Sequence, residues 1–180
     1  MTTTYNILQW NSDSVYHQER LGAVAADVDN YLLPRFLNTV KQGPISIADF
    51  SCGRGTITCD FVTKVESCGY TVKKILLIDV DESNLSIATE QVQTMFPHIT
   101  VQTFQCNGHN FSNFDLEPVD FLYCWDSMVH FDILDIAGYL GTLTKVVNGT
   151  ALFHHSNNNT VTHSIMDNTH HRNFMTREAF

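Results

Sequence analysis

Positively charged residues are scarce in this sequence of 180 residues. It has ten Lys and Arg against nineteen Asp and Glu, which gives a net charge of -9 with histidine neutral. Such a surface repels phosphate backbones and anionic headgroups, so the composition disfavours nonspecific binding to nucleic acid or to a membrane. We therefore expect a small-molecule or glycan partner, no nucleic acid and no membrane, and leave a homo-oligomer open.

Long apolar runs and paired cysteines are also lacking. No run approaches the ~18 residues that a membrane-spanning helix needs, and the start Met-Thr-Thr-Thr-Tyr lacks the pattern of a secretory signal. An odd, scattered set of cysteines without a CxxC pair is typical of buried free thiols in a reducing compartment. The sequence therefore predicts a cytoplasmic protein; its cysteines are Cys52, Cys59, Cys68, Cys106 and Cys124.

Fixed metal-ligand spacing is absent as well, although there are nine histidines. Asp126, His130 and His154 could together hold a divalent ion, but no zinc-type spacing supports such a site. We therefore predict no metal. The histidines of the polar C-terminal stretch, His163, His170 and His171, are expected to be solvated.

The stretch Ile45 to Gly55 organises the chain. A short apolar run passes through Asp49 into a glycine-bearing turn, and Thr56 to Ser67 then carries a helical pattern. Such a junction leaves backbone N–H groups beside the turn where the polar end of a nucleotide-like ligand can approach. We predict a single domain over 1–180, with a helical cap over 1–44, a cofactor-binding core over 45–157, and a polar loop and helix start over 158–180.

The cap contains a predicted helix from Ser12 to Tyr31. Two interpretations of it stay open. It packs on the sheet edge, or it covers the ligand, so that Trp10, Tyr16 and His17 line the pocket.

The acidic residue before the turn indicates which kind of ligand the turn binds. A dinucleotide loop disfavours a carboxylate at Asp49 and needs a small residue where Thr58 stands, so NAD fits poorly. A cofactor with a sulfonium and an amino group would instead be stabilised by that negative charge.

The run Asp49-Phe50-Ser51-Cys52-Gly53-Arg54-Gly55 resembles the acidic, glycine-rich first motif of class I S-adenosylmethionine-dependent methyltransferases. The family's first glycine is Ser51 here. The resemblance implies S-adenosylmethionine as cofactor, and its predicted contacts in this motif are Asp49, Ser51, Cys52, Gly53 and Gly55.

Two further segments supply predicted cofactor contacts. Asp79, followed by Val80, closes the apolar run Val72 to Ile78, and its carboxylate can accept both hydroxyls of a ribose. A helix cap is the alternative role, although Asp81 could supply that cap. After the predicted strand Thr100 to Cys106, the resemblance implies that Asn107, with Gly108, binds the adenine amine; an ordinary Asn-Gly turn is equally consistent.

A third carboxylate ends the buried run Phe121 to Trp125. Ligands of open parallel sheets bind outside the carboxyl ends of strands, so Asp126 is expected to face the same crevice as Asp49 and Asp79. Asp132 is expected to cap a helix that continues to Val147 and ends at Asn148-Gly149, with a strand over Thr150 to Phe153 after it.

The runs Trp125-Asp126-Ser127-Met128-Val129-His130 and His154-His155-Ser156-Asn157 look like those of bacterial small-molecule and sugar methyltransferases with FDSLVH-like and HHSN-like runs. The resemblance covers about 45–157. It implies an α/β fold, a three-layer Rossmann-like sandwich with a mostly parallel sheet of order 3-2-1-4-5. The family's terminal strands 6 and 7 are expected to be missing from this chain.

The same resemblance implies methyl transfer, at an oxygen of the acceptor, by in-line displacement. The cofactor carries the activated group, so the protein has to align the acceptor, exclude water and take up a proton. The predicted bases are His130 and His154, with His155 as the alternative to His154, because neighbours in a strand point to opposite faces and at most one of the pair faces the acceptor. A helix-start residue packed near the pocket stays open for His130. Asp126 orients one of the bases or contacts the cofactor. Two alternatives stay open: a noncatalytic cofactor-binding or assembly module, and an NAD(P)-dependent oxidoreductase.

Overall fold

The computed structural model describes residues 25–155, and the account of the structure is confined to them. Strands and helices alternate along the chain, as the hydrophobic pattern predicts. The elements are η1 (Val28–Leu32), α3 (Leu33–Thr39), β1 (Pro44–Phe50), α4 (Thr56–Ser67), β2 (Thr71–Asp79), α5 (Glu82–Met95), β3 (Thr100–Gln105), β4 (Val119–Cys124), η2 (Met128–His130), α6 (Ile133–Gly141), η3 (Leu143–Lys145) and β5 (Val147–Phe153).

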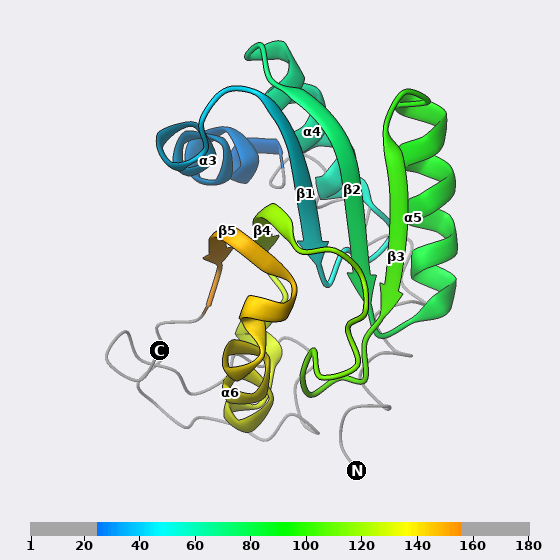
Figure 1. Ribbon diagram of the computed structural model, residues 1–180, viewed down its shortest axis with the longest axis vertical. Helices are drawn as coiled ribbons and strands as arrows, with labels where there is room; N and C mark the ends of the chain where they lie inside the picture. The colour runs from blue at the N-terminus through cyan, green and yellow to red at the C-terminus, as the bar shows by residue number, and fades with distance from the viewer. Residues whose placement is uncertain (1–24, 156–180) are drawn as a thin grey trace.

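The five strands form one parallel sheet in the order β3-β2-β1-β4-β5. The predicted Rossmann-like fold and its 3-2-1-4-5 order are thereby confirmed for the described residues. Because all strands run the same way, their carboxyl ends lie at one edge of the sheet, where the arrowheads of β1, β2 and β3 point in Figure 1. The strand order reverses between β1 and β4, which places the crevice of such a fold there.

The sheet is covered on both faces, which explains why its central strands are nearly continuous apolar runs. Alternate residues of a strand point to opposite faces. Ile75 and Leu77 of β2 therefore join one hydrophobic cluster with α3, α4 and α5, while Leu76 and Ile78 join a second cluster with α6. Figure 1 shows α4 and α5 apart from α6 in this arrangement.

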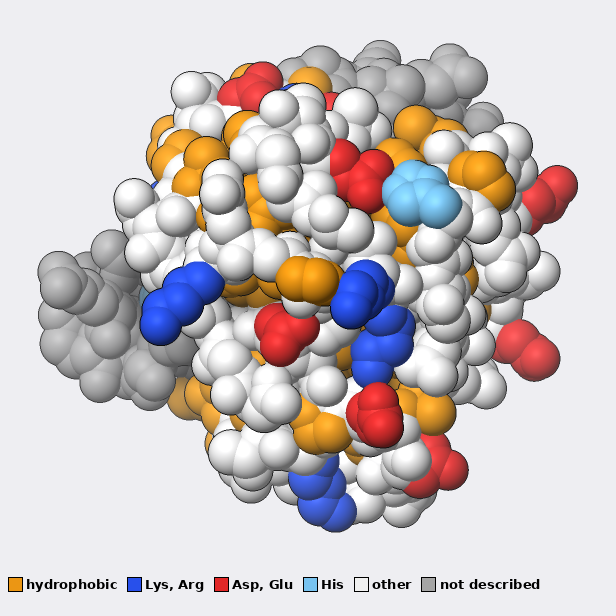
Figure 2. All heavy atoms as spheres, turned by 45° about the horizontal axis from the view of Figure 1, so that its top comes forward, with side chains coloured by type: hydrophobic (Ala, Val, Ile, Leu, Met, Phe, Trp, Pro, Cys, Tyr) orange, Lys and Arg blue, Asp and Glu red, His pale blue; other side chains and the backbone are white. Residues whose placement is uncertain are grey.

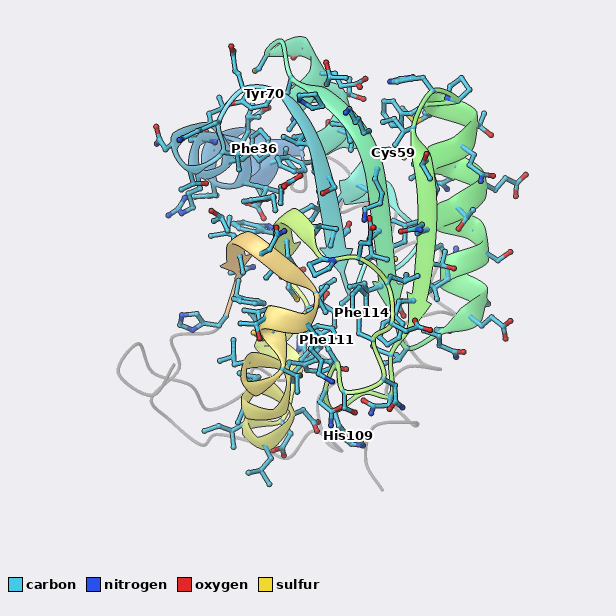
Figure 3. The ribbon with its side chains drawn as sticks, in the orientation of Figure 1. Phe36, Cys59, Tyr70, His109, Phe111 and Phe114 are labelled. Atoms are coloured by element: carbon cyan, nitrogen blue, oxygen red, sulfur yellow. The ribbon has the colours of Figure 1, made fainter. Side chains whose placement is uncertain are left out.

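Among the described residues before β1, η1 and α3 form a helical segment. Its main anchor is Phe36, fully buried, whose ring meets Phe61, Tyr70 and Phe121 at centroid distances of 5.4, 4.9 and 5.1 Å. Figure 3 shows Phe36 and Tyr70 together at the end of the sheet away from the strand tips. The proposed pocket residues Trp10, Tyr16 and His17 lie outside the described residues.

The helix after β4 is shorter than predicted. α6 ends at Gly141, and β5 already begins at Val147, so Asn148 and Gly149 lie inside a strand and end no helix. At this end the Thr142 N–H donates to the Tyr139 carbonyl at 3.2 Å, and the Thr142 hydroxyl donates to the Gly138 carbonyl and accepts the N–H of Phe111. The extra residue opposite β4 makes a bulge, since Val119 pairs with Val147 but Phe121 pairs with Thr150.

All five cysteines are free thiols, as predicted. Four of them are buried. Cys68, at the end of α4, is exposed, contrary to the expectation of buried thiols throughout.

Two glycines of α6 give a test of how the loop after β3 packs on this helix. A Cβ on Gly138 would lie 2.2 Å from the His109 carbonyl oxygen, whereas a Cβ on Gly141 would meet nothing within 4 Å. We expect Gly138→Ala to lower the free energy of unfolding by about 1–3 kcal/mol through overpacking. Gly141→Ala should raise it by up to about 1 kcal/mol, because alanine is the better helix former.

Urea unfolding of the two variants measures the difference. Both replace glycine by alanine in one helix, so propensity is matched and only the backbone clash differs. Equal effects of the two changes would contradict the tight approach of the loop to α6.

Candidate cofactor and acceptor site

Both non-glycine residues with a positive φ in residues 25–155 stand just beyond the ends of neighbouring central strands. Ser51 follows β1 with φ 67°, and Asp126 follows β4 with φ 55°. The left-handed region is costly for residues with a Cβ, and such strain clusters at functional sites. The two strained residues flank the point where the strand order reverses, so they mark the candidate site.

The glycine turn is held against the end of β2. Ser51 and Cys52 both donate their N–H groups to the Ile78 carbonyl, at 2.7 and 3.0 Å. Gly53 donates its N–H to the Asp79 carboxylate at 2.9 Å, and Gly55 donates to the Cys52 carbonyl at 3.0 Å. The sequence predicts unpaired N–H groups beside the turn, but these four are hydrogen-bonded within the chain. They therefore fix the shape of the turn.

Gly55 has to be glycine for two reasons. Its φ of 83° is left-handed, and a Cβ there would lie 3.0 Å from the Cβ of Ala88 in α5. The residue thus lets α4 begin close against α5. Its role is tight packing of the loop, which holds the turn rigidly at the strand tips.

Asp49 is buried at the end of β1 and is 3% exposed. One of its carboxylate oxygens, Oδ2, accepts two hydroxyl hydrogens: Thr58 of α4 donates at 2.6 Å and Tyr123 of β4 donates at 2.8 Å. Within residues 25–155, no Lys, Arg or His forms an ion pair with Asp49. The carboxylate therefore ties a strand to a helix and to the next strand.

Burial raises the pKa of Asp49 from its ordinary 3.8 to about 7. The hydroxyls of Thr58 and Tyr123 oppose this rise, because they hydrogen-bond the ionised form, and the nearby Asp79 carboxylate adds to it. The net effect is a carboxyl group that ionises less readily than an exposed aspartate.

Asp79 closes β2 and is 5% exposed. Besides the N–H of Gly53, its carboxylate accepts the N–H of Asp81 at 3.0 Å. Desolvation raises the pKa of Asp79, while these N–H groups and the Asn84 side chain work against the rise. The alternative role as a helix cap falls to Asp81 instead, whose carboxylate accepts the N–H of Ser83 in the first turn of α5.

The third strand brings its own loop beside Asp79. Cys106 donates its N–H to the Asp79 carbonyl at 2.9 Å, and Gln105 donates a side-chain N–H to the carbonyl of Val80 at 3.1 Å. Asn107 follows, and its side-chain oxygen accepts the N–H groups of His109 and Asn110 at 2.8 and 2.9 Å. The Asn-Gly turn interpretation is confirmed for that oxygen, and Gly108 has the expected left-handed φ of 86°.

A small hollow of about 230 Å³ lies beside this loop. Polar amides supply much of its wall, and it opens near the tip of β3. Its lining residues are Phe104, Gln105, Cys106, Asn107, Asn110 and Asn113. Figure 3 shows Phe111, Phe114 and His109 in this region, near the strand tips and toward α6.

Asp126 and His154 meet at the tips of β4 and β5. The backbone N–H of Asp126 donates to Nδ1 of His154 at 3.1 Å, and His154 donates its own N–H to the Cys124 carbonyl at 2.9 Å. The His154 ring stacks on Trp125 with a centroid distance of 4.7 Å. The structure thereby places two of the three predicted catalytic residues in contact.

His130, the third, is the half-buried last residue of η2, and its N–H donates to the Ser127 carbonyl at 2.9 Å. In the part of the chain that the structure describes, no three or more His, Cys, Asp or Glu side chains gather as metal ligands would. Asp126, His130 and His154, which the sequence analysis considered as a possible metal site, do not form such a group.

Sequence reasoning missed two residues that hold Asp49. Thr58 was considered only as an obstacle to a dinucleotide, and Tyr123 only as part of a buried strand. The spacing of nine residues from Asp49 to Thr58 gave no signal. For Tyr123, the signal is the parallel register, in which Asp49 pairs with Tyr123 across β1 and β4.

The surface agrees with the excess of acidic residues. On the face that Figure 2 shows, some Lys and Arg side chains lie next to one another near the middle with an acidic side chain beside them, and the others stand apart. Among the helices of residues 25–155, none has the length and apolarity that crossing a bilayer requires.

Comparison with known proteins gives one family match. The model of the family described as methyltransferase domain matches residues 47–149, which lie within the predicted core over 45–157. No curated protein matches the sequence.

Solved structures share the fold at low sequence identity. An S-adenosylmethionine-dependent methyltransferase from Clostridium acetobutylicum is 18% identical, with a TM-score of 0.55 over 83% of this chain and 56% of that one. A protein from Pyrococcus horikoshii is also 18% identical, with a TM-score of 0.53 over 81% of this chain and 60% of that one. Phosphoethanolamine N-methyltransferase 1 from Haemonchus contortus was solved with phosphoethanolamine and S-adenosylhomocysteine. It is 17% identical, with a TM-score of 0.51 over 75% of this chain and 26% of that one. This chain thus spans at most 60% of the length of these three structures.

The burial of Asp49 predicts a pH dependence of stability. Between about pH 4 and pH 7 the unfolded chain loses this proton while the folded chain keeps it, so the contribution of Asp49 to stability falls as pH rises. The fall over this window is at most about 4 kcal/mol. Asp49→Asn keeps an oxygen for both hydroxyls but does not titrate.

Urea unfolding of the wild type and of Asp49→Asn across this range gives the measurement. The wild type should lose stability relative to the variant as pH rises. Parallel stability curves would contradict the raised pKa of Asp49.

Proposed function

Since the chain belongs to the methyltransferase-domain family, we propose that it binds S-adenosylmethionine and transfers its methyl group to a small-molecule or glycan acceptor, at an oxygen atom. The observation that carries the proposal is the pair of buried acids, Asp49 and Asp79, on either side of a fixed glycine turn at the switch point of the sheet. The likeness to solved methyltransferases supports the fold on which this depends.

The chemistry of the two acids fits this cofactor. Both carboxylates are buried, both have a raised pKa, and within residues 25–155 neither forms an ion pair with Lys, Arg or His. A ligand with a sulfonium and an ammonium group would supply the missing positive charge.

We assign the cofactor's parts to the residues predicted from the sequence. Asp79 would accept the ribose hydroxyls with the carboxylate lone pairs that Gly53, Asp81 and Asn84 leave available. Val80 and the loop at Asn107 and Gly108 would border the adenine. Asp49, at 3% exposure, would act through its charge and by holding Thr58 at the start of α4.

The backbone of Ser51, Cys52, Gly53 and Gly55 would then form the floor of the cofactor site. The turn is already shaped by its internal hydrogen bonds, so little ordering is needed when the ligand binds. A rigid floor also fixes the methyl donor relative to the acceptor.

Once bound, the cofactor supplies an activated methyl group, so the protein itself needs no nucleophile. The residues at the tips of β4 and β5 would align the acceptor hydroxyl opposite that group and keep water away. His130 is the base that we assign to the acceptor proton, because imidazole titrates near neutral pH and η2 follows β4 at the crevice. Asp126 would contact the methionine part of the cofactor. The free thiols are consistent with a cytoplasmic setting.

A noncatalytic cofactor-binding module is the second candidate. Ser51 motivates it, because the left-handed position that the family fills with glycine carries a side chain here. Such a module would bind the cofactor without turnover across acceptors.

Exchange of Asp79 tests the cofactor assignment. We expect Asp79→Asn to weaken binding of S-adenosylhomocysteine by about tenfold or more, since an amide cannot accept both ribose hydroxyls as a carboxylate does. Isothermal titration calorimetry measures the dissociation constant. Asp81→Ala is the matched control: it removes the cap of α5 and about 1 kcal/mol of stability but should leave affinity unchanged. Equal affinity of Asp79→Asn and wild type would remove Asp79 from the site.

A thermal-shift comparison separates the classes of ligand. S-adenosylhomocysteine at about 100 times its dissociation constant should stabilise the folded chain by about 2.7 kcal/mol, whereas NAD should give no shift. A shift with NAD alone would favour an oxidoreductase. Binding of S-adenosylmethionine without consumption across hydroxylated small molecules and glycans would favour the noncatalytic module.

A further inference from the structure

His154 was predicted as a general base, but its surroundings favour a different role. It is held from three directions: by its backbone N–H on the Cys124 carbonyl, by its ring on Trp125, and by the Asp126 N–H on Nδ1. Groups so constrained are suited to hold a neighbour in place.

The hydrogen bond from Asp126 fixes the form of the ring. A backbone N–H can only donate, so Nδ1 of His154 must carry a lone pair, and the neutral ring then has its proton on Nε2. A base needs a lone pair that faces the acceptor, and the only lone pair of this form is covered by Asp126. Proton uptake at Nδ1 would set two N–H groups against each other.

The neighbour that gains from this bond is strained. Asp126 has a φ of 55°, a conformation that costs a residue with a side chain on the order of 1–3 kcal/mol and persists only where the surroundings enforce it. The bond from its N–H to His154 is one such restraint. Without this hydrogen bond, the backbone after β4 would lose one restraint that keeps Asp126 in the left-handed conformation.

The restraint reaches back to the N-terminal helical segment. Trp125 donates its indole N–H to the Asp27 carboxylate at 3.3 Å and stacks on Tyr31 with a centroid distance of 6.3 Å. Arg35 in turn lies 5.9 Å from the Tyr31 ring. His154 therefore belongs to a row of stacked groups that fixes Trp125, and with it the start of the turn at Asp126.

We propose that His154 is a positioning residue, which as the Nε2-protonated tautomer holds Asp126 in its left-handed conformation so that the Asp126 carboxylate faces the cofactor. The inference rests on the proposed function, because it needs a cofactor for Asp126 to contact. It leaves proton uptake to His130.

Two isosteric changes test the role. His154→Asn places an amide oxygen where Nδ1 stands, so it keeps an acceptor for the Asp126 N–H; His154→Gln places its amide where Nε2 stands and loses that acceptor. We expect the affinity of His154→Asn for S-adenosylhomocysteine to stay within about threefold of wild type, and that of His154→Gln to fall about tenfold. If both variants keep wild-type affinity, the proposal is overturned and the role as a base returns.

Nitrogen-15 NMR of the wild-type imidazole rings gives an independent readout that does not need a folded variant. Long-range proton–nitrogen correlation should show His154 as the Nε2-protonated tautomer at neutral pH, and a protonated Nδ1 would overturn the proposal. Should wild type show this tautomer yet fail to bind S-adenosylhomocysteine, the proposed function fails, while the contact between His154 and Asp126 stands.

Discussion

The hydrogen bonds to the buried Asp49 carboxylate are the interaction on which the site depends. One carboxylate oxygen receives the hydroxyls of Thr58 and Tyr123, so β1, α4 and β4 meet at a single atom. A buried carboxylate without partners would cost several kcal/mol, which makes these two hydroxyls obligatory. Because β1 and β4 flank the point where the strand order reverses, the bonds fix the geometry of the crevice as well as its stability.

Around this atom the chain accepts further unfavourable features. Asp79 is a second buried acid, and its charge opposes ionisation of Asp49. Ser51 and Asp126 are both left-handed although neither is glycine. Charge repulsion and backbone strain therefore coincide at one edge of the sheet, while the rest of the described core is apolar and regularly packed. A ligand that brings positive charge to this edge lowers the first of these costs.

Hydrophobic period and turn chemistry predicted most of the fold. Thr56 to Ser67 is the predicted helix to the residue, and the strands that end at Asp79 and Cys124 lie within two residues of the expected ends. The end of α6 could not be predicted, since the local pattern gives no sign of the bond between the Thr142 hydroxyl and the Phe111 N–H, 31 positions away in the sequence. Tyr123 stayed hidden for the same reason: in an apolar run, only the register of neighbouring strands reveals that its hydroxyl meets an acid.

The chemistry of His154 shows where sequence reasoning has to stop. A histidine after a strand in this fold suggests a base, since its ordinary pKa lies near neutrality. Which nitrogen carries the proton depends on the partner of the other, and here that partner is the N–H of a residue 28 positions earlier. The same N–H belongs to the strained residue of β4's tip. In our proposal, this hydrogen bond makes His154 a restraint on Asp126 and leaves proton uptake to His130.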